Sequence, residues 1–255
     1  MSEATAFSAA ALLIAVAFSC STAERWLRRR RLHDAAWTVA MICFALGAAP
    51  FFLATETGWT PWLFRLFYLF GGVLTVPILA LGTVYLLVKR PWANRLALVV
   101  ALLSAFSAGV VLTAPLRVAL VADRLNEGRE VFGVLPRFLA AASSGLGASV
   151  VIVGAVVSAA RLLRADPHRS PAAKAGRGAS PRSRLRLAGA NALIAVGTLL
   201  ISAKGPFVAL SGSDEIGFAF ALAVGLAVIF AGFLVASTPA RRCAPQFGRA
   251  TVSSS

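Results

Sequence analysis

The sequence predicts an all-α, polytopic membrane protein with seven transmembrane helices, an N-terminus outside the cell and a C-terminus in the cytoplasm. Three observations lead to this prediction. Hydrophobic residues make up 58% of the 255 residues, and the mean hydropathy is +0.80. Apolar stretches of about 20 residues recur along the chain, and a helix of that length crosses roughly 30 Å of hydrocarbon. Basic residues gather on alternate connections between these stretches.

The first apolar stretch, residues 4–23, sets the orientation of the chain. Five arginines follow it within residues 25–31, and no basic residue precedes it. A cleaved signal peptide has its basic residues before the apolar core, so we expect a retained helix. Because an arginine cluster is costly to move across a bilayer, residues 25–31 should stay in the cytoplasm.

The remaining helices follow from the apolar stretches and from the turn residues between them. The predicted helices are residues 4–23, 37–55, 63–88, 96–114, 134–163, 187–203 and 216–236. Residues 164–184 are rich in Ala, Pro, Gly, Ser and Arg, and this composition predicts a disordered cytoplasmic loop. We expect one seven-helix transmembrane domain over residues 1–240 and a cytoplasmic tail over residues 241–255. All five tryptophans are predicted to lie at the membrane interfaces.

The net charge of +15 is better explained by membrane topology than by nucleic-acid binding. With these helices, the predicted cytoplasmic side carries 19 Lys and Arg residues and 3 acidic residues. The predicted outer side carries 6 Lys and Arg residues and 7 acidic residues. Such an asymmetry is typical of multi-pass membrane proteins. We therefore expect a protein of the cell inner (cytoplasmic) membrane, with anionic lipid head groups at its basic face and no nucleic-acid partner.

The largest predicted outer connection is residues 116–133. Asp123, Arg124 and Glu127 lie at helical spacing, which predicts a short surface helix that breaks at Gly128. We expect a solvated cap at this place, with a lid as the alternative.

Charged and polar residues at the predicted outer helix ends form the candidate ligand site. The candidate ligand-binding residues are Glu56, Arg65, Tyr68, Arg137 and Lys204. If their helices converge, these side chains line an outward-facing mouth that suits an anion or a lipid head group. We also expect an ion pair between Glu56 and Arg65. The alternative is that the charged side chains anchor the membrane interface by snorkelling.

Two prolines, Pro50 and Pro77, are predicted to kink their helices, because proline removes a backbone hydrogen bond. The two helices are neighbours in a hairpin, so both bends could open one cavity. The alternative is that the prolines serve only helix packing.

An internal repeat is a further hypothesis. Residues 40–47 align with residues 190–197 at an offset of 150. Helices one to three and five to seven would then form a 3+1+3 arrangement, as in transporter folds built from parallel repeats. Chance similarity between apolar helices is the alternative.

The predicted membrane interior carries no ionisable residue at mid-depth, and the sequence contains no recognisable catalytic, metal or cofactor motif. Proton pumps and ion-coupled carriers usually place ionisable residues inside. We expect no cofactor and no enzymatic activity. The sequence favours a non-catalytic sensor or carrier that binds a small apolar or amphipathic ligand from the outer side. The alternative is a structural or assembly subunit that contacts a membrane protein partner through the predicted fifth helix, with its small residues at 143–149, and through the basic loops.

Overall fold

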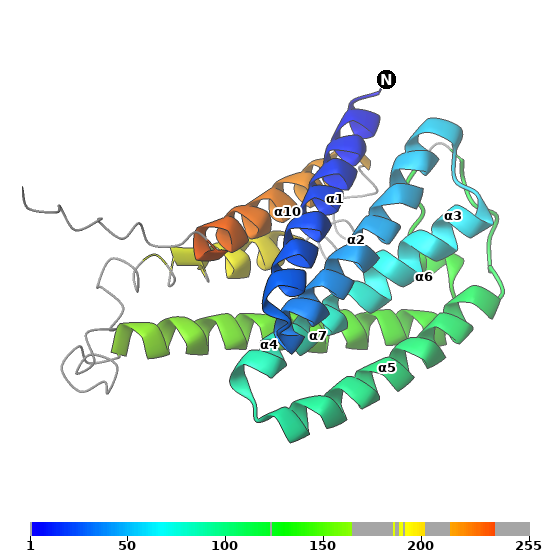
Figure 1. The fold of residues 1–255 in the computed structure, drawn as a ribbon. Helices are drawn as coiled ribbons and strands as arrows, with labels where there is room; N and C mark the ends of the chain where they lie inside the picture. The colour runs from blue at the N-terminus through cyan, green and yellow to red at the C-terminus, as the bar shows by residue number, and fades with distance from the viewer. Residues whose placement is uncertain are drawn as a thin grey trace, which may run out of the picture.

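The computed structural model describes residues 2–122, 124–164, 186, 189–190, 192–201 and 215–237. Every regular element among these residues is helical, and the long helices pack into one bundle (Figure 1). The elements are α1 (Glu3–Arg29), α2 (Leu32–Thr57), α3 (Pro61–Leu66), the π-helix η1 (Phe67–Leu74), α4 (Thr75–Leu87), α5 (Arg90–Thr113), α6 (Gly128–Val131), α7 (Val134–Arg164) and α10 (Glu215–Ser237).

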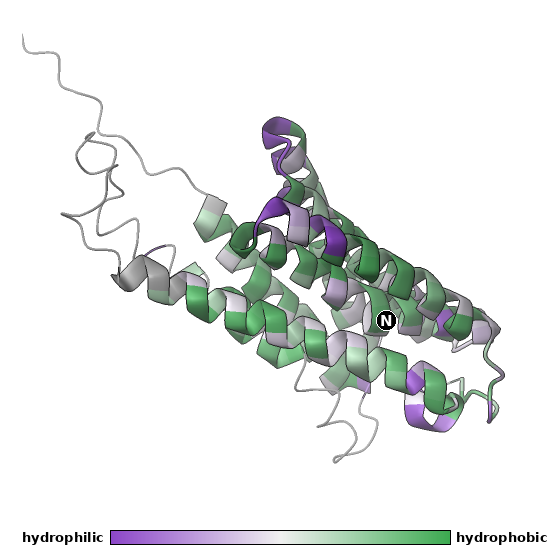
Figure 2. Cartoon of the chain, turned by 90° about the horizontal axis from the view of Figure 1, so that it is seen from below, coloured by the Kyte–Doolittle hydropathy of each residue, from purple (hydrophilic) through white to green (hydrophobic). Residues whose placement is uncertain are grey.

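Six helical segments of the described chain are long and apolar enough to cross a membrane. Figure 2 shows that the bodies of the long helices are mainly hydrophobic and that hydrophilic residues gather toward their ends. The all-helical fold predicted from the sequence is confirmed, and these segments fit a multi-pass membrane protein. The count of seven stays a prediction, because the predicted sixth helix is described only in part, with an apolar helix at Ala192–Ile201.

Three predicted features fall outside the described residues. They are the loop predicted at 164–184, apart from its first residue, Arg164, which ends α7, the candidate ligand residue Lys204 and the tail at 241–255.

Several helices extend beyond their predicted ends. α1 continues through Arg28 and Arg29, α2 begins at Leu32 and α5 begins at Arg90. Hydropathy does not mark these charged turns, although helical hydrogen bonds continue through them. Between α1 and α2, Arg30 adopts a left-handed conformation (φ 51°), and its N–H donates to the Trp26 carbonyl. This bond caps the end of α1.

The two ends of the bundle differ in character, and we name them for what they hold. The arginine end holds the α1–α2 turn at Arg30 and the α4–α5 turn at Lys89. The cap end holds the α2–α3 turn at Gly58 and the cap segment, residues 114–133, which connects α5 to α7.

The cap segment differs from the predicted surface helix. Its described residues before Gly128 are loop and turn, and α6 begins at Gly128 instead of breaking there. The side chain of Asn126 accounts for this difference. Its amide donates to the carbonyls of Val121 and Arg124, and its Oδ1 accepts from the Val121 N–H. These bonds satisfy the backbone locally and compete with a helix.

A continuous helix, α3–η1–α4, forms the centre of the bundle and packs against both α2 and α7. Glycines bring the backbones into direct contact. A Cβ at Gly47 of α2 would lie 2.8 Å from the amide nitrogen of Gly71. A Cβ at Gly147 of α7 would lie 3.0 Å from the nitrogen of Pro77. A larger residue at either position would therefore push the helices apart.

The π-helix η1 lies directly before Pro77 in this central helix. Proline has no N–H, so one carbonyl of the preceding turn lacks its usual helical partner. The Ser144 hydroxyl of α7 donates to the Gly72 carbonyl at 2.6 Å. The Phe70 carbonyl accepts from the Thr75 N–H and also from the Thr75 hydroxyl, the latter at 2.6 Å. Side chains thus satisfy the irregular backbone in apolar surroundings.

The glycines aligned by the proposed internal repeat make comparable contacts. Gly47 packs against Gly71 in the helix that follows it along the chain. A Cβ at Gly197 would lie 2.7 Å from the carbonyl oxygen of Gly225 in α10. Both glycines thus allow backbone contact with a neighbouring helix, and the repeat stays a hypothesis.

We predict that Gly47→Ala lowers the thermal stability of the detergent-solubilised protein, by about 1–3 kcal/mol, because its Cβ would overlap the Gly71 backbone. The control is Gly145→Ala, where a Cβ meets nothing within 4 Å. The control should be neutral or slightly stabilising, because alanine favours a helix over glycine by about 1 kcal/mol. Equal changes in Tm for the two variants would contradict the close contact.

Candidate functional site

The structure describes four of the five predicted ligand-binding residues, and the outer mouth that they would form stays a prediction. Glu56 and Arg137 are exposed near the ends of α2 and α7. Arg65 and Tyr68 are half-buried in the central helix, and their side chains contact α5 and the cap segment. Lys204 lies outside the described residues.

Arg65 fixes the central helix to α5. Its Nη1 donates to the carbonyls of Val111 and Leu112, at 2.8 and 2.7 Å. The last carbonyls of a helix have no partner inside that helix, so Arg65 caps α5 from outside. Within the described part of the chain, no ion pair joins Arg65 to Glu56. The expected pairing is replaced by this capping role.

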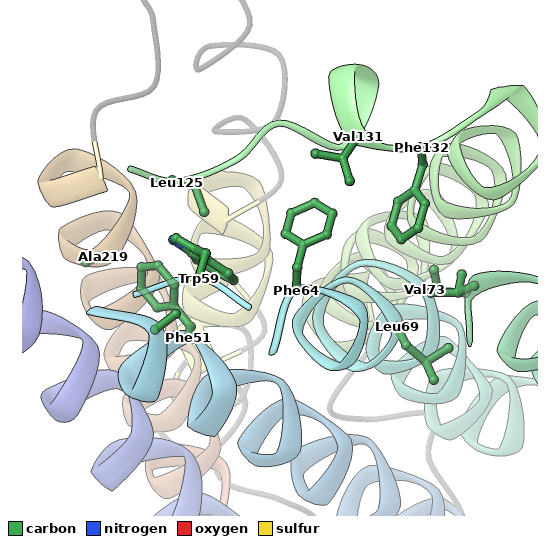
Figure 3. Close-up of a cluster of buried hydrophobic side chains, with 11 residues drawn as sticks. Phe51, Trp59, Phe64, Leu69, Val73, Leu125, Val131, Phe132 and Ala219 are labelled. Carbon is green, nitrogen blue, oxygen red and sulfur yellow. The ribbon is translucent and has the colours of Figure 1, made fainter. Parts of the chain in front are cut away.

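Tyr68 packs against an aromatic cluster at the cap end. Figure 3 shows buried members of this cluster, among them Trp59, Phe64 and Phe132. Its ring centroid lies 4.8 Å from that of Phe132, and the Phe64 and Phe132 centroids are 5.5 Å apart. Trp59 packs edge-on against Phe64 at 5.8 Å. Trp59 is only 5% exposed, so its ring packs inside the protein and does not face lipid, while its depth at the membrane interface stays a prediction.

The cap segment seals this cluster. Leu125, Val131 and Phe132 of the segment are buried against the aromatic rings (Figure 3). Its backbone also pairs with the bundle, because the Trp59 N–H donates to the Ala122 carbonyl at 3.1 Å. A Cβ at Gly128 would lie 2.4 Å from Cε2 of Tyr68, so the segment rests directly on that ring. The expected solvated cap is therefore a cap with a packed apolar underside.

A partly open groove of about 410 Å³ lies beside the cap, between the end of α5 and the start of α7. It is lined by Val110, Thr113, Ala114, Pro115, Arg117, Gly133, Val134, Leu135 and Pro136. The walls are mainly apolar. The Thr113 hydroxyl donates to the Gly109 carbonyl of its own helix at 2.7 Å. Arg117 supplies the one charged side chain of this lining.

This groove was not predicted from the sequence, although two prolines in the sequence mark its position. Pro115 and Pro136 mark the end of α5 and the first turn of α7, and both line the groove. Pro115 cannot continue α5, and proline is tolerated in the first turn of a helix, so the two prolines mark the helix ends that meet at the groove. Neither Pro50, buried inside α2, nor Pro77 in α4 lines the groove.

A buried ion pair lies at the arginine end, where the sequence predicted a loop. Nη2 of Arg25 is 2.6 Å from Oδ1 of Asp34, which is 1% exposed. Nε2 of His33 lies 3.7 Å from the other oxygen of Asp34. The Arg25 guanidinium also lies over the Phe233 ring at 4.2 Å and over the Trp37 ring at 5.2 Å. Arg25 thereby joins α1 to α2 and α10.

The position of Asp34 explains why it was missed. The residue lies in the first turn of α2, where a negative charge is favoured by the helix dipole. By hydropathy alone it belongs to the polar connection after the arginine cluster, because the apolar stretch begins only at residue 37.

The described residues contain no group of three His, Cys, Asp or Glu side chains that could hold a metal ion. Comparison with known proteins finds no matching family model, curated protein or solved structure. The function proposed below therefore depends on the geometry of the groove and on the charge distribution.

We predict that Asp34→Asn destabilises the solubilised protein by about 3–5 kcal/mol, because it leaves the Arg25 charge without its buried counter-ion. The matched control is Glu24→Gln. Glu24 pairs with Arg28 across one helical turn, but both side chains are exposed, at 64% and 77%. That loss should cost about 0.5 kcal/mol or less. If the Tm of Asp34→Asn were as high as that of Glu24→Gln, the buried ion pair would not contribute to the stability of the protein.

Proposed function

We propose that this chain is a non-catalytic, multi-pass protein of the cell inner membrane that binds a small amphipathic molecule from the outer side, as a sensor or carrier. The observation that supports this proposal is the groove between α5 and α7. Its volume of about 410 Å³ falls in the range of about 300–1,000 Å³ that is usual for ligand sites. Apolar walls with a few polar groups are also typical of such sites.

The proposed orientation places the cap end outside the cell and the arginine end in the cytoplasm. The α1–α2 turn carries Arg28 to Arg31, and the α4–α5 turn carries Lys89 and Arg90. Basic residues at one end of the helices favour the cytoplasmic side. In this orientation the arginine end meets the anionic head groups of the inner leaflet, and the groove opens at the level of the outer head groups.

The groove is suited to a ligand that arrives from the bilayer. Val134 and Leu135 on its α7 wall are 69% and 50% exposed. In a membrane these side chains face lipid, so an acyl chain can enter sideways without first crossing water. Among the described lining residues, the polar side chains are those of Thr113 and Arg117. That pair can orient a polar head, but it includes no general base beside a nucleophile.

A second candidate function, a subunit of a membrane protein complex, is favoured by the surface of α5. This helix lies at the edge of the bundle (Figure 1) and buries only Ala93, Ser107 and Val111. Leu98 and Leu102 on its free surface are 62% and 63% exposed. A partner helix could cover this surface, and a stoichiometric membrane protein that copurifies with the chain would support this function.

The test uses a phospholipid with a photoreactive diazirine in its acyl chain, mixed into vesicles that hold the purified protein. Cross-linked peptides are mapped by mass spectrometry. We expect more labelling at the groove than around Leu102. The Leu102 side chain is 63% exposed, close to the 69% of Val134 at the groove. Ala114→Trp fills the groove and should lower this labelling about tenfold, whereas Leu102→Trp should leave it unchanged. Equal labelling of the groove and the surroundings of Leu102 would show an ordinary lipid surface.

A further inference from the structure

The arginines of the cap end are not equivalent. Arg65 donates to the end of α5, Arg129 pairs with Glu127, and Arg124 lies 3.8 Å from Glu130. Arg117 differs from these three. Within the described part of the chain, its guanidinium makes no hydrogen bond or ion pair. The groove therefore carries a cation that has no counter-ion among the residues that the structure describes.

The backbone around Arg117 holds this cation at the groove. The Arg117 N–H donates to the Val131 carbonyl at 2.9 Å, which ties the start of the cap segment to its end. The guanidinium then lies beside Gly133. A Cβ at Gly133 would be 3.5 Å from Nη2 and 3.6 Å from Nε of Arg117. These are ordinary van der Waals distances, so the planar group packs against the backbone at Gly133.

The charge of the surroundings favours an anion. The groove lining includes no Asp or Glu. Arg137, next to the lining residue Pro136, is a second exposed cation in the first turns of α7. A guanidinium binds phosphate or carboxylate oxygens through paired N–H donors, and such charge-assisted bonds are about twice as strong as neutral ones. Apolar walls below the cation supply a place for an acyl chain.

We propose that the occupant of the groove is an anionic membrane lipid, with its phosphate held by Arg117 and its acyl chain between α5 and α7. This inference rests on the proposed function and adds the charge of the ligand and the residue that selects it. The occupant comes from the surrounding bilayer and not from free phosphate, because one exposed guanidinium without the apolar contacts holds an anion only weakly.

The experiment compares two probes that share one photoreactive acyl chain, phosphatidylglycerol and phosphatidylcholine, in vesicles with the full-length protein. We expect groove peptides to be labelled about tenfold more by phosphatidylglycerol. Arg117→Gln should abolish this preference. Arg129→Gln removes the same charge from the same segment, but its side chain is already paired with Glu127, so the preference should remain. Millimolar inorganic phosphate should not compete with the lipid.

The possible results separate the inference from the proposed function. Equal groove labelling by both lipids would overturn anionic selection and leave an amphiphile site in place. A preference that persists in Arg117→Gln, or that is lost equally in Arg129→Gln, would overturn the role of Arg117. Competition by inorganic phosphate would show a soluble anion site in place of a lipid site. No labelling of the groove above that around Leu102 would overturn the proposed function and the inference together.

Discussion

The packing of the central helix α3–η1–α4 between α2 and α7 is the constraint on which the rest of the structure depends. At Gly47 and Gly147 the neighbouring helices approach to backbone contact, which fixes both their separation and their register. Pro77 removes one backbone hydrogen bond from this helix, and the Ser144 hydroxyl of α7 donates to the nearby Gly72 carbonyl. The irregular segment and its supporting helix therefore depend on each other.

This packing determines what the cap end can do. The central helix presents Phe64 and Tyr68 to the cap segment, which covers them with Phe132 and rests on the Tyr68 ring. Arg65 holds the end of α5 at the same level, so the space beside the cap opens between α5 and α7. The packing of the central helix thus accounts both for the cap segment that covers the aromatic cluster and for the groove that opens between α5 and α7.

The sequence was sufficient for properties that depend on composition and length, and insufficient for those that depend on which side chains meet. Long apolar stretches predicted the helices, with α7 and α10 within a residue of their observed bounds. The buried partner of Arg25 was not predictable, because Asp34 looks like a loop residue until α1 and α2 are placed side by side. Arg65 was expected to pair with Glu56, since hydropathy cannot show that the unsatisfied end of α5 lies nearby.

The most direct test of this account is the thiol reactivity of two positions that flank the end of the cap segment, in a background with the native cysteines replaced by alanine. Val131 lies on the buried underside of the cap segment and is 1% exposed, whereas Val134 at the groove is 69% exposed. With N-ethylmaleimide in mild detergent, Val134→Cys should react at least about tenfold faster than Val131→Cys, because thiol reactivity follows exposure. Equal rates would mean that the cap does not seal the aromatic cluster, which contradicts the account.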